Sequence, residues 1–152
     1  MFGVGCPSVR EVTGDLWDFD CTMRAICTNG FLKTNGYAVM GAGTARQAAQ
    51  RYPNLPEVLG KCIAARKGPH VVAIRHDIVA FPTKRDWRDP ADLALIRQSA
   101  QELLELAERM GWKLIALPRP GCGLGQLRWG DVKPILEEVW GDDPRFVIVD
   151  NS

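Results

Sequence analysis

Hydrophobic residues recur along the chain with two spacings, and these spacings predict strands that alternate with helices. Short apolar or alternating runs predict strands at residues 9–13, 24–28, 71–74, 78–81, 114–117 and 146–149. Apolar residues three and four apart predict helices at about 44–52, 56–66, 90–110 and 131–140. Because the two kinds of element alternate, we expect a three-layer α/β/α sandwich around a mixed, mostly parallel central sheet.

The helix at 90–110 has the clearest pattern. Asp89 and Pro90 suit its cap and first position, and Gly111 suits its end. Its predicted inner face comprises Leu93, Ile96, Ala100, Leu103, Leu104, Ala107 and Met110. Asp131 is predicted to cap the last helix, whose inner residues would be Val132, Ile135, Leu136 and Val139. His76 and Asp77 separate two apolar runs, which favours a turn over a catalytic pair.

Two glycine-containing loops stand at the junctions of this pattern. One covers residues 39–45, and the other follows the strand at 114–117 and carries glycine at 121, 123 and 125. Glycine lets the main chain approach an anion closely, and backbone N–H groups between a strand and a helix bind phosphates. Neither a Walker loop nor a GxGxxG fingerprint is present. Since ligands bind at the carboxyl ends of parallel strands, both loops should meet at one edge of the sheet.

Composition narrows the class of protein. The chain has 152 residues, 46% of them apolar and 24% charged, which indicates one soluble domain. The net charge of +1 gives no field for nonspecific nucleic-acid binding. The tryptophans are spread along the sequence and do not alternate with basic residues, so no stacking platform for single strands is predicted. Lys84, Arg85 and Arg88 lie in one polar loop, which is either solvated or faces a charged partner.

The five cysteines are irregularly spaced, with no CxxC or Cys/His cluster. We therefore expect neither a disulfide framework nor a metal, and no cofactor. Free thiols indicate a reducing compartment, and no apolar run is long enough to span a membrane. The resulting expectation is a cytoplasmic monomer without a membrane partner.

Three sequence pieces together resemble the macro domain, the ADP-ribose-binding fold. They are Gly14-Asp15-Leu16, the stretch from Asn29 to Ala45 with Val39-Met-Gly-Ala-Gly-Thr-Ala45, and Pro118-x-Pro-Gly-Cys-Gly-Leu-Gly-x-Leu-x-Trp129. The third piece and residues 40–45 most resemble the branch that contains the terminal ADP-ribose protein glycohydrolase. The order of elements matches over residues 9–150, so we expect residues 1–152 to form a single macro domain.

The resemblance implies a role for each piece. Asp15 would accept a hydrogen bond from the adenine amino group, with the Leu16 amide facing adenine, and Asn29 would contact the distal ribose. The first loop would surround the distal ribose and one phosphate through Met40, Gly41, Ala42, Gly43 and Thr44. The second would hold the diphosphate on backbone amides of Gly121, Cys122, Gly123, Leu124, Gly125, Gln126 and Leu127.

Departures from the glycohydrolase branch concern catalysis. The resemblance implies a lysine nucleophile in the helix after the first loop, where this chain has Ala48-Ala49-Gln50-Arg51. It also implies a catalytic aspartate at the position of Gly125, so this lysine–aspartate pair is absent. Asn29 and Lys33 are then the candidates for catalysis, although Lys33 also suits a solvated position. Cys122 has no neighbouring histidine and suits a packed position better than a nucleophile.

The predicted function is binding of ADP-ribose, free or as a terminal unit on a modified protein or nucleic acid, with hydrolytic removal of ADP-ribosyl groups. Two alternatives stay open at this point. One is a reader of ADP-ribose without catalysis, and the other is an ADP-ribose 1″-phosphate phosphatase. An NAD-binding fold is disfavoured, because GxGxxG is missing after the first strand.

Overall fold

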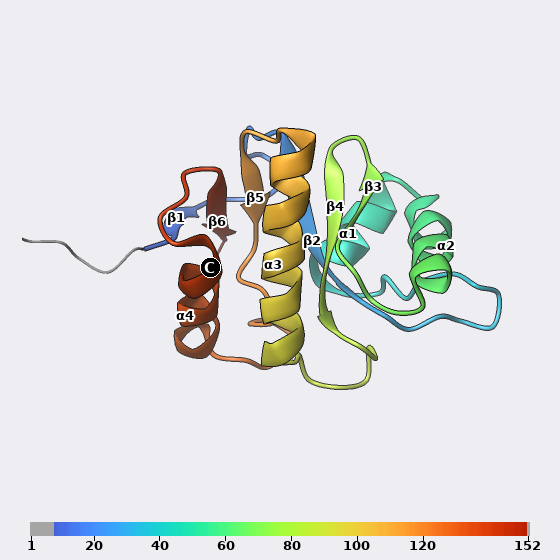
Figure 1. Ribbon diagram of the computed structural model, residues 1–152. Helices are drawn as coiled ribbons and strands as arrows, with labels where there is room; N and C mark the ends of the chain where they lie inside the picture. Colours follow the sequence, from blue (N-terminus) through green and yellow to red (C-terminus); the bar gives the residue numbers. More distant parts are fainter. Residues whose placement is uncertain (1–7, 152) are drawn as a thin grey trace, which may run out of the picture.

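A six-stranded sheet with helices on both faces organises the computed structural model, which describes residues 8–151 (Figure 1). The strands are β1 (Arg10–Thr13), β2 (Met23–Asn29), β3 (Val72–Arg75), β4 (Ile78–Lys84), β5 (Ile115–Leu117) and β6 (Phe146–Asp150). The helices are α1 (Gly43–Arg51), α2 (Leu55–Arg66), α3 (Leu93–Met110) and α4 (Trp129–Trp140). These elements confirm the predicted fold class.

The strands lie in the order β1-β6-β5-β2-β4-β3. Every neighbouring pair is parallel except β3 and β4, which form an antiparallel hairpin. His76 and Asp77 lie in the turn of that hairpin, as predicted. The order places β5, β2 and β4 side by side, so their carboxyl ends share one edge of the sheet.

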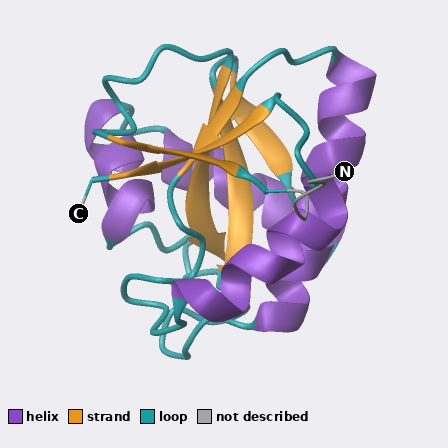
Figure 2. Cartoon of the chain, turned by 90° about the vertical axis from the view of Figure 1, so that its left-hand side faces the viewer, coloured by secondary structure: helices purple, strands orange, loops and turns teal. Residues whose placement is uncertain are grey.

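Two hydrophobic cores lie on opposite faces of the sheet. On one face α3 and α4 pack over β4, β5 and β6, where the Trp140 ring stacks on Phe146 at 4.2 Å between centroids. On the other face α1 and α2 cover Ile26, Ile78 and Ala80. Figure 2 shows helices on both sides of the strands. The segment after β1 completes the second face, because Leu16 packs against Ala116 and Val147.

The start of α3 differs from the prediction. Asp92, rather than Asp89, is the cap, and its carboxylate accepts hydrogen bonds from the N–H groups of Ala94 (2.9 Å) and Leu95 (3.4 Å). The buried face is correspondingly shifted. Leu93 and Met110 at the helix ends are 36% and 57% exposed, whereas Leu95 and Ser99 are buried.

The start of α4 also differs, since the helix begins at Trp129 and Asp131 lies in its first turn. There the Asp131 carboxylate interacts with the positive end of the helix dipole instead of capping the chain. Val132 and Leu136 are buried as predicted, Ile135 and Val139 are only partly buried, and Trp140 is buried in addition.

No helix of residues 8–151 is both long and apolar enough to cross a membrane. Within the same residues, no three His, Cys, Asp or Glu side chains gather in a way that would hold a metal ion. The cysteines at 21, 27, 62 and 122 are free thiols, and Cys6 lies outside the described residues.

Candidate ligand-binding cleft

A cleft of about 930 Å³ opens where β2, β4 and β5 end. Both glycine loops line it, the first through residues 41–45 and the second through Gly121 and residues 123–126. The loops therefore meet at one sheet edge, as the parallel pattern predicts. Its volume is at the upper end of the range for small-molecule sites and accommodates a ligand of dinucleotide size.

The first loop presents the N-terminus of α1 to the cleft. Ala42 at the cap position makes no side-chain capping hydrogen bond, and the first turn of α1 contains no acidic residue. The Thr44 hydroxyl accepts a hydrogen bond of 3.0 Å from the Cys27 N–H, which ties the start of α1 to β2. Uncapped N–H groups and the positive end of the helix dipole make this terminus suited to an anion.

The second loop is folded tightly by its own backbone. The N–H of Leu127 donates to the Gly121 carbonyl at 2.9 Å, and the N–H of Gln126 donates to the Gly123 carbonyl at 3.0 Å. Gly121 has a φ of +73°, which favours glycine. Within residues 8–151, the amides of residues 123, 124 and 125 have no hydrogen-bond partner. They are available to hold an anion.

Gly125 closes this loop against a neighbouring segment. The N–H of Ala91 donates to the Gly125 carbonyl at 2.9 Å. A Cβ atom at Gly125 would lie 2.5 Å from the Gly121 carbonyl oxygen and 2.8 Å from the Ala91 Cβ. The space for a side chain at position 125 is thus occupied, so the loop in this conformation cannot hold an aspartate there.

Asn29, at the end of β2, lines the cleft and also shapes it. Its side-chain nitrogen donates to the Val39 carbonyl at 3.0 Å, and its oxygen accepts from the Phe31 N–H at 3.0 Å. These bonds hold both ends of the segment between β2 and the first loop. A direct role for Asn29 at the ligand stays a prediction.

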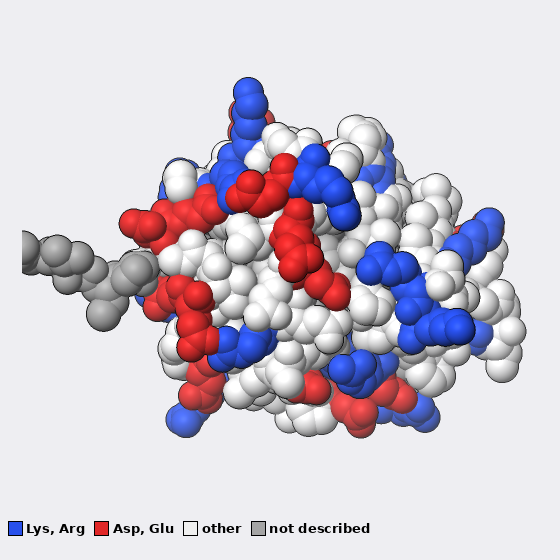
Figure 3. All heavy atoms as spheres, viewed as in Figure 1, with Lys and Arg blue, Asp and Glu red and all other residues white. Residues whose placement is uncertain are grey.

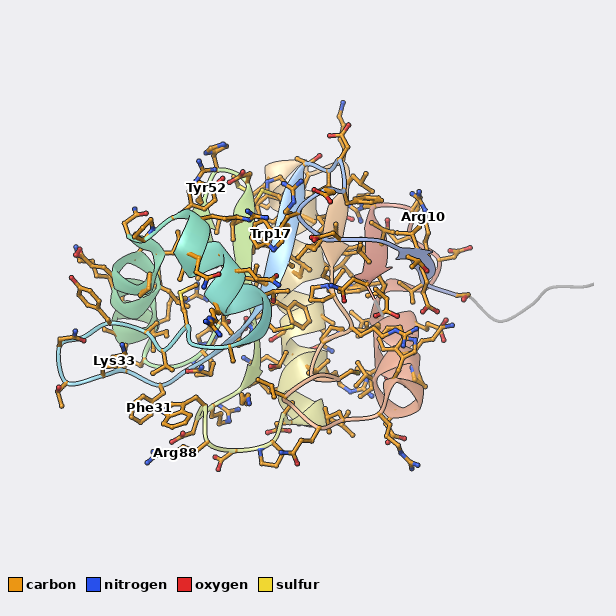
Figure 4. All side chains as sticks on the ribbon, turned by 180° about the vertical axis from the view of Figure 1, so that it is seen from behind. Arg10, Trp17, Phe31, Lys33, Tyr52 and Arg88 are labelled. Atoms are coloured by element: carbon orange, nitrogen blue, oxygen red, sulfur yellow. The ribbon has the colours of Figure 1, made fainter. Side chains whose placement is uncertain are left out.

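Two lysines face the cleft. Lys33 lies in the segment after β2 and is exposed, whereas Lys84 is the last residue of β4 and is half-buried (Figure 4 labels Lys33). Lys84 pairs in register with Asn29, and its Nζ donates to the Trp87 carbonyl at 3.5 Å. Within the described chain, neither lysine forms an ion pair with a carboxylate.

Sequence reasoning missed Lys84 as a site residue. Asn29 was assigned through the resemblance to the macro domain, but the rule that ligands bind at the carboxyl ends of parallel strands also applies to the first charged residue after the apolar run 78–81. The signal was hidden because β4 continues through Pro82 and Thr83, both buried, to Lys84. Thr83, Trp87, Asp89 and Arg119 were likewise missed, and all of them line the cleft. Arg88 also lines it and was placed by the sequence only in a loop that is either solvated or faces a charged partner.

The two cysteines near the loops are poor nucleophiles. Burial raises the pKa of the Cys27 thiol to about 11. Burial also raises the pKa of Cys122 above its ordinary value. Both thiols are protonated at neutral pH, and the thiolate is the reactive form.

An ionic network anchors the second loop to β1 and α4. Glu11 accepts hydrogen bonds from Lys133 Nζ (2.7 Å) and Trp129 Nε1 (3.1 Å), and Arg119 lies 3.4 Å from both Glu11 and Asp150. Partial burial acts to raise the pKa of Glu11, but Lys133, Trp129 and Arg119 together hold it below its ordinary value. Glu11 is therefore ionised at neutral pH and fixes Arg119 at the base of the loop.

Five of the predicted ligand residues do not line the cleft. Asp15 is exposed, and its carboxylate accepts a hydrogen bond of 2.8 Å from the Trp17 N–H. Leu16 and Met40 are buried in the cores, while Cys122 and Leu127 are partly buried against the α3–α4 face. The adenine contacts predicted for Asp15 and Leu16 stay predictions.

Comparison with known proteins identifies relatives of this fold. A family model described as "Macro domain" matches residues 34–136. The "DNA ADP-ribosyl glycohydrolase" of Mycobacterium tuberculosis is 32% identical over 121 residues, which are 72% of this chain and 34% of that protein. The protein of the same name from Thermus aquaticus is 29% identical over 116 residues, 69% of this chain and 32% of that protein. The chain thus spans about a third of the length of these relatives.

A solved structure described as "Macrodomain of Mycobacterium tuberculosis DarG" has the same fold. It superposes with a TM-score of 0.78 and 27% sequence identity, and the match covers 96% of this chain and 99% of that one. The described domain therefore corresponds to a whole domain of that protein.

Proposed function

This chain belongs to the macro domain family, and we propose that it binds ADP-ribose and hydrolyses the bond that joins ADP-ribose to a carrier. Relatives named DNA ADP-ribosyl glycohydrolase support both parts of this proposal, and they make a nucleic acid the first carrier to test. The observation that carries the proposal is the convergence of two amide-rich loops and a lysine on one cleft.

The diphosphate would lie between the two loops. The unpartnered amides of residues 123–125 line the cleft from one side, and the uncapped start of α1 lines it from the other. Both offer N–H donors to an anion without needing a basic side chain. A diphosphate in this position would orient the distal ribose towards the ends of β2 and β4, where Asn29 and Lys84 are neighbours.

Lys84 is the nucleophile that we propose. Its amine would attack C1″ of the distal ribose, forming an N–C1″ bond while the bond from C1″ to the carrier breaks. The carrier leaves with the bonding electron pair and takes up a proton. Water then hydrolyses the lysine adduct, which releases ADP-ribose and restores the amine. In this proposal β4 supplies the lysine that is absent from the helix after the first loop.

Substitution of Lys84 tests catalysis separately from binding. We expect Lys84→Ala to lower the rate of ADP-ribose release from a modified oligonucleotide at least about 100-fold, because it removes the nucleophile. Calorimetry should find ADP-ribose affinity little changed. Lys33→Ala is the comparison variant, since Lys33 lines the same cleft from an exposed loop. Its kcat should equal that of wild type, and only its KM for the oligonucleotide should rise, through the loss of one phosphate contact. Loss of turnover in Lys33→Ala with full turnover in Lys84→Ala would assign the reaction to Lys33.

A reader without catalysis is the second candidate, and the occupied space at Gly125 favours it. Heat of binding with ADP-ribose but no release from modified DNA or protein would establish that function. Release of phosphate from ADP-ribose 1″-phosphate in place of ADP-ribose from a carrier would instead indicate a phosphatase. Absence of any heat with ADP-ribose would reject all three.

A further inference from the structure

We propose that the mouth of the cleft carries a base-binding rim, formed by Phe31, Lys33, Trp87 and Arg88, which stacks on a nucleobase of a single-stranded nucleic-acid carrier. This inference rests on the proposed function, because the carrier must leave the cleft past these residues. In this proposal the rim residues select the carrier, and they take no part in the hydrolysis.

The rim is assembled from two segments that are far apart in the sequence. The Arg88 guanidinium lies 5.1 Å from the centre of the Phe31 ring and 5.9 Å from that of Trp87. The N–H of Gly30 donates to the Arg85 carbonyl at 3.1 Å, which joins the segment after β2 to the one after β4. Figure 4 shows Phe31 and Arg88 next to each other below Lys33. The aromatic–basic cluster that is absent from the linear sequence is therefore present in the fold.

Trp87 gives the rim an open aromatic surface. Trp87 is 50% exposed although it lines the cleft, and Leu124 lines the cleft from the second loop with 69% exposure. Large apolar side chains exposed together at the mouth of a cleft mark a binding surface. A nucleobase fits such a surface because it is flat, apolar on its faces and polar at its edge.

The charges at the rim have two different roles. Arg88 is fixed by Asp86, whose carboxylate accepts from Arg88 Nε at 2.9 Å and from an Arg88 terminal nitrogen at 2.6 Å. This pairing orients the guanidinium plane over Phe31, where it extends the stacking surface. Lys33, in contrast, lines the cleft without a carboxylate partner among residues 8–151 and is available to a phosphate.

Single strands fit this rim better than duplexes do. Figure 3 shows both signs of charge on the face that α3 covers. At the rim itself, Asp86 pairs with Arg88 and Asp89 lines the cleft, so no extended basic surface is offered to a double helix. A base inside a duplex keeps its faces covered by its neighbours and must leave the stack before an enzyme reaches it. Stacking on an aromatic side chain with a few phosphate contacts is the pattern of single-strand binding.

The test compares Trp87→Ala with wild type on three carriers of ADP-ribose, namely a single-stranded oligonucleotide, the same strand in a duplex, and a protein. For the single strand we expect the KM to rise about 10-fold with kcat nearly unchanged, because one stacking contact is lost away from the reacting carbon. Trp87→Phe should recover most of the affinity. For the protein carrier, Trp87→Ala and wild type should have the same KM. Free ADP-ribose should bind to Trp87→Ala and to wild type with equal affinity.

Tyr37→Ala is the matched control, since Tyr37 is another exposed aromatic residue, in the segment that carries Phe31, but lies outside the cleft. Its KM should equal that of wild type. Lys33→Ala should weaken the salt dependence of single-strand binding by about one phosphate contact. An unchanged KM for the single strand in Trp87→Ala, or an equal rise in KM for the DNA and protein carriers, would rule out the base-binding rim. If wild type neither binds nor releases ADP-ribose, the proposed function fails instead.

Discussion

At the scale of single residues, Gly125 and Gly123 have different roles in the second loop. A Cβ atom there would lie 2.5 Å from the Gly121 carbonyl oxygen, whereas a Cβ atom at Gly123 would meet nothing within 4 Å. The two glycines therefore differ although the sequence presents them as equivalents. Gly125 is required by close packing, and Gly123 leaves an open backbone at the cleft.

This difference predicts unequal effects on stability. We expect Gly125→Ala to lower the free energy of unfolding by about 1–3 kcal/mol, because the added methyl group forces the loop and the Ala91 segment apart. Gly123→Ala is the control and should change stability by less than about 0.5 kcal/mol. Urea unfolding monitored by tryptophan fluorescence measures both. Equal losses in the two variants would contradict the packing argument.

The sequence was sufficient to predict some residues of the cleft but not others. Most of the loop residues were found because glycine between a strand and a helix has a local physical meaning. Asn29 was assigned through the resemblance to the macro domain. Lys84 and Phe31 were not found, since their importance comes from the neighbours that the fold supplies, Asn29 in the adjacent strand and Arg88 in another loop. Pairings across the sheet and across loops leave no periodic trace in the sequence.

At the scale of elements, the start of α3 shows how tertiary contacts override a local signal. Asp89 and Pro90 form a good start signal, yet the helix begins three residues later. The N–H of Ala91 donates to the Gly125 carbonyl, and the N–H of Asp92 donates to the Thr83 carbonyl at 2.8 Å. These bonds hold residues 91 and 92 outside the helix. The element was predictable from its apolar spacing, but its boundary depended on partners from β4 and the second loop.

The displaced start predicts which aspartate stabilises the helix. Asp92→Ala should lower the free energy of unfolding by about 1 kcal/mol, because two N–H groups at the start of α3 lose their acceptor. Asp89→Ala should change stability by less than about 0.5 kcal/mol, since its carboxylate caps no helix. Thermal and urea unfolding at neutral pH compare the two. A larger loss of stability in Asp89→Ala than in Asp92→Ala would indicate that α3 begins at Asp89 and Pro90, as the sequence predicts.

At the scale of the whole molecule, the cleft joins the two cores. The first loop continues into α1, which belongs to the core that α1 and α2 form, and the second loop contacts the core of α3 and α4. A diphosphate held between the loops would connect both faces of the sheet. The alternation of strands and helices was enough to predict this architecture, whereas the order β5-β2-β4 that aligns the loops was not.

Ligand binding should therefore stabilise the molecule as a unit and protect specific amides. At 100 times its dissociation constant, ADP-ribose is expected to add about 2.7 kcal/mol to the free energy of unfolding. For a domain of this size that corresponds to a rise in Tm of roughly 5–10 °C. Hydrogen exchange should slow at the amides of residues 123–125, which lack partners in the free protein. Adenosine, which has no diphosphate, is the control and should leave their exchange unchanged. A rise in Tm without slower exchange at these amides would indicate that the diphosphate binds at the start of α1 and not at the second loop.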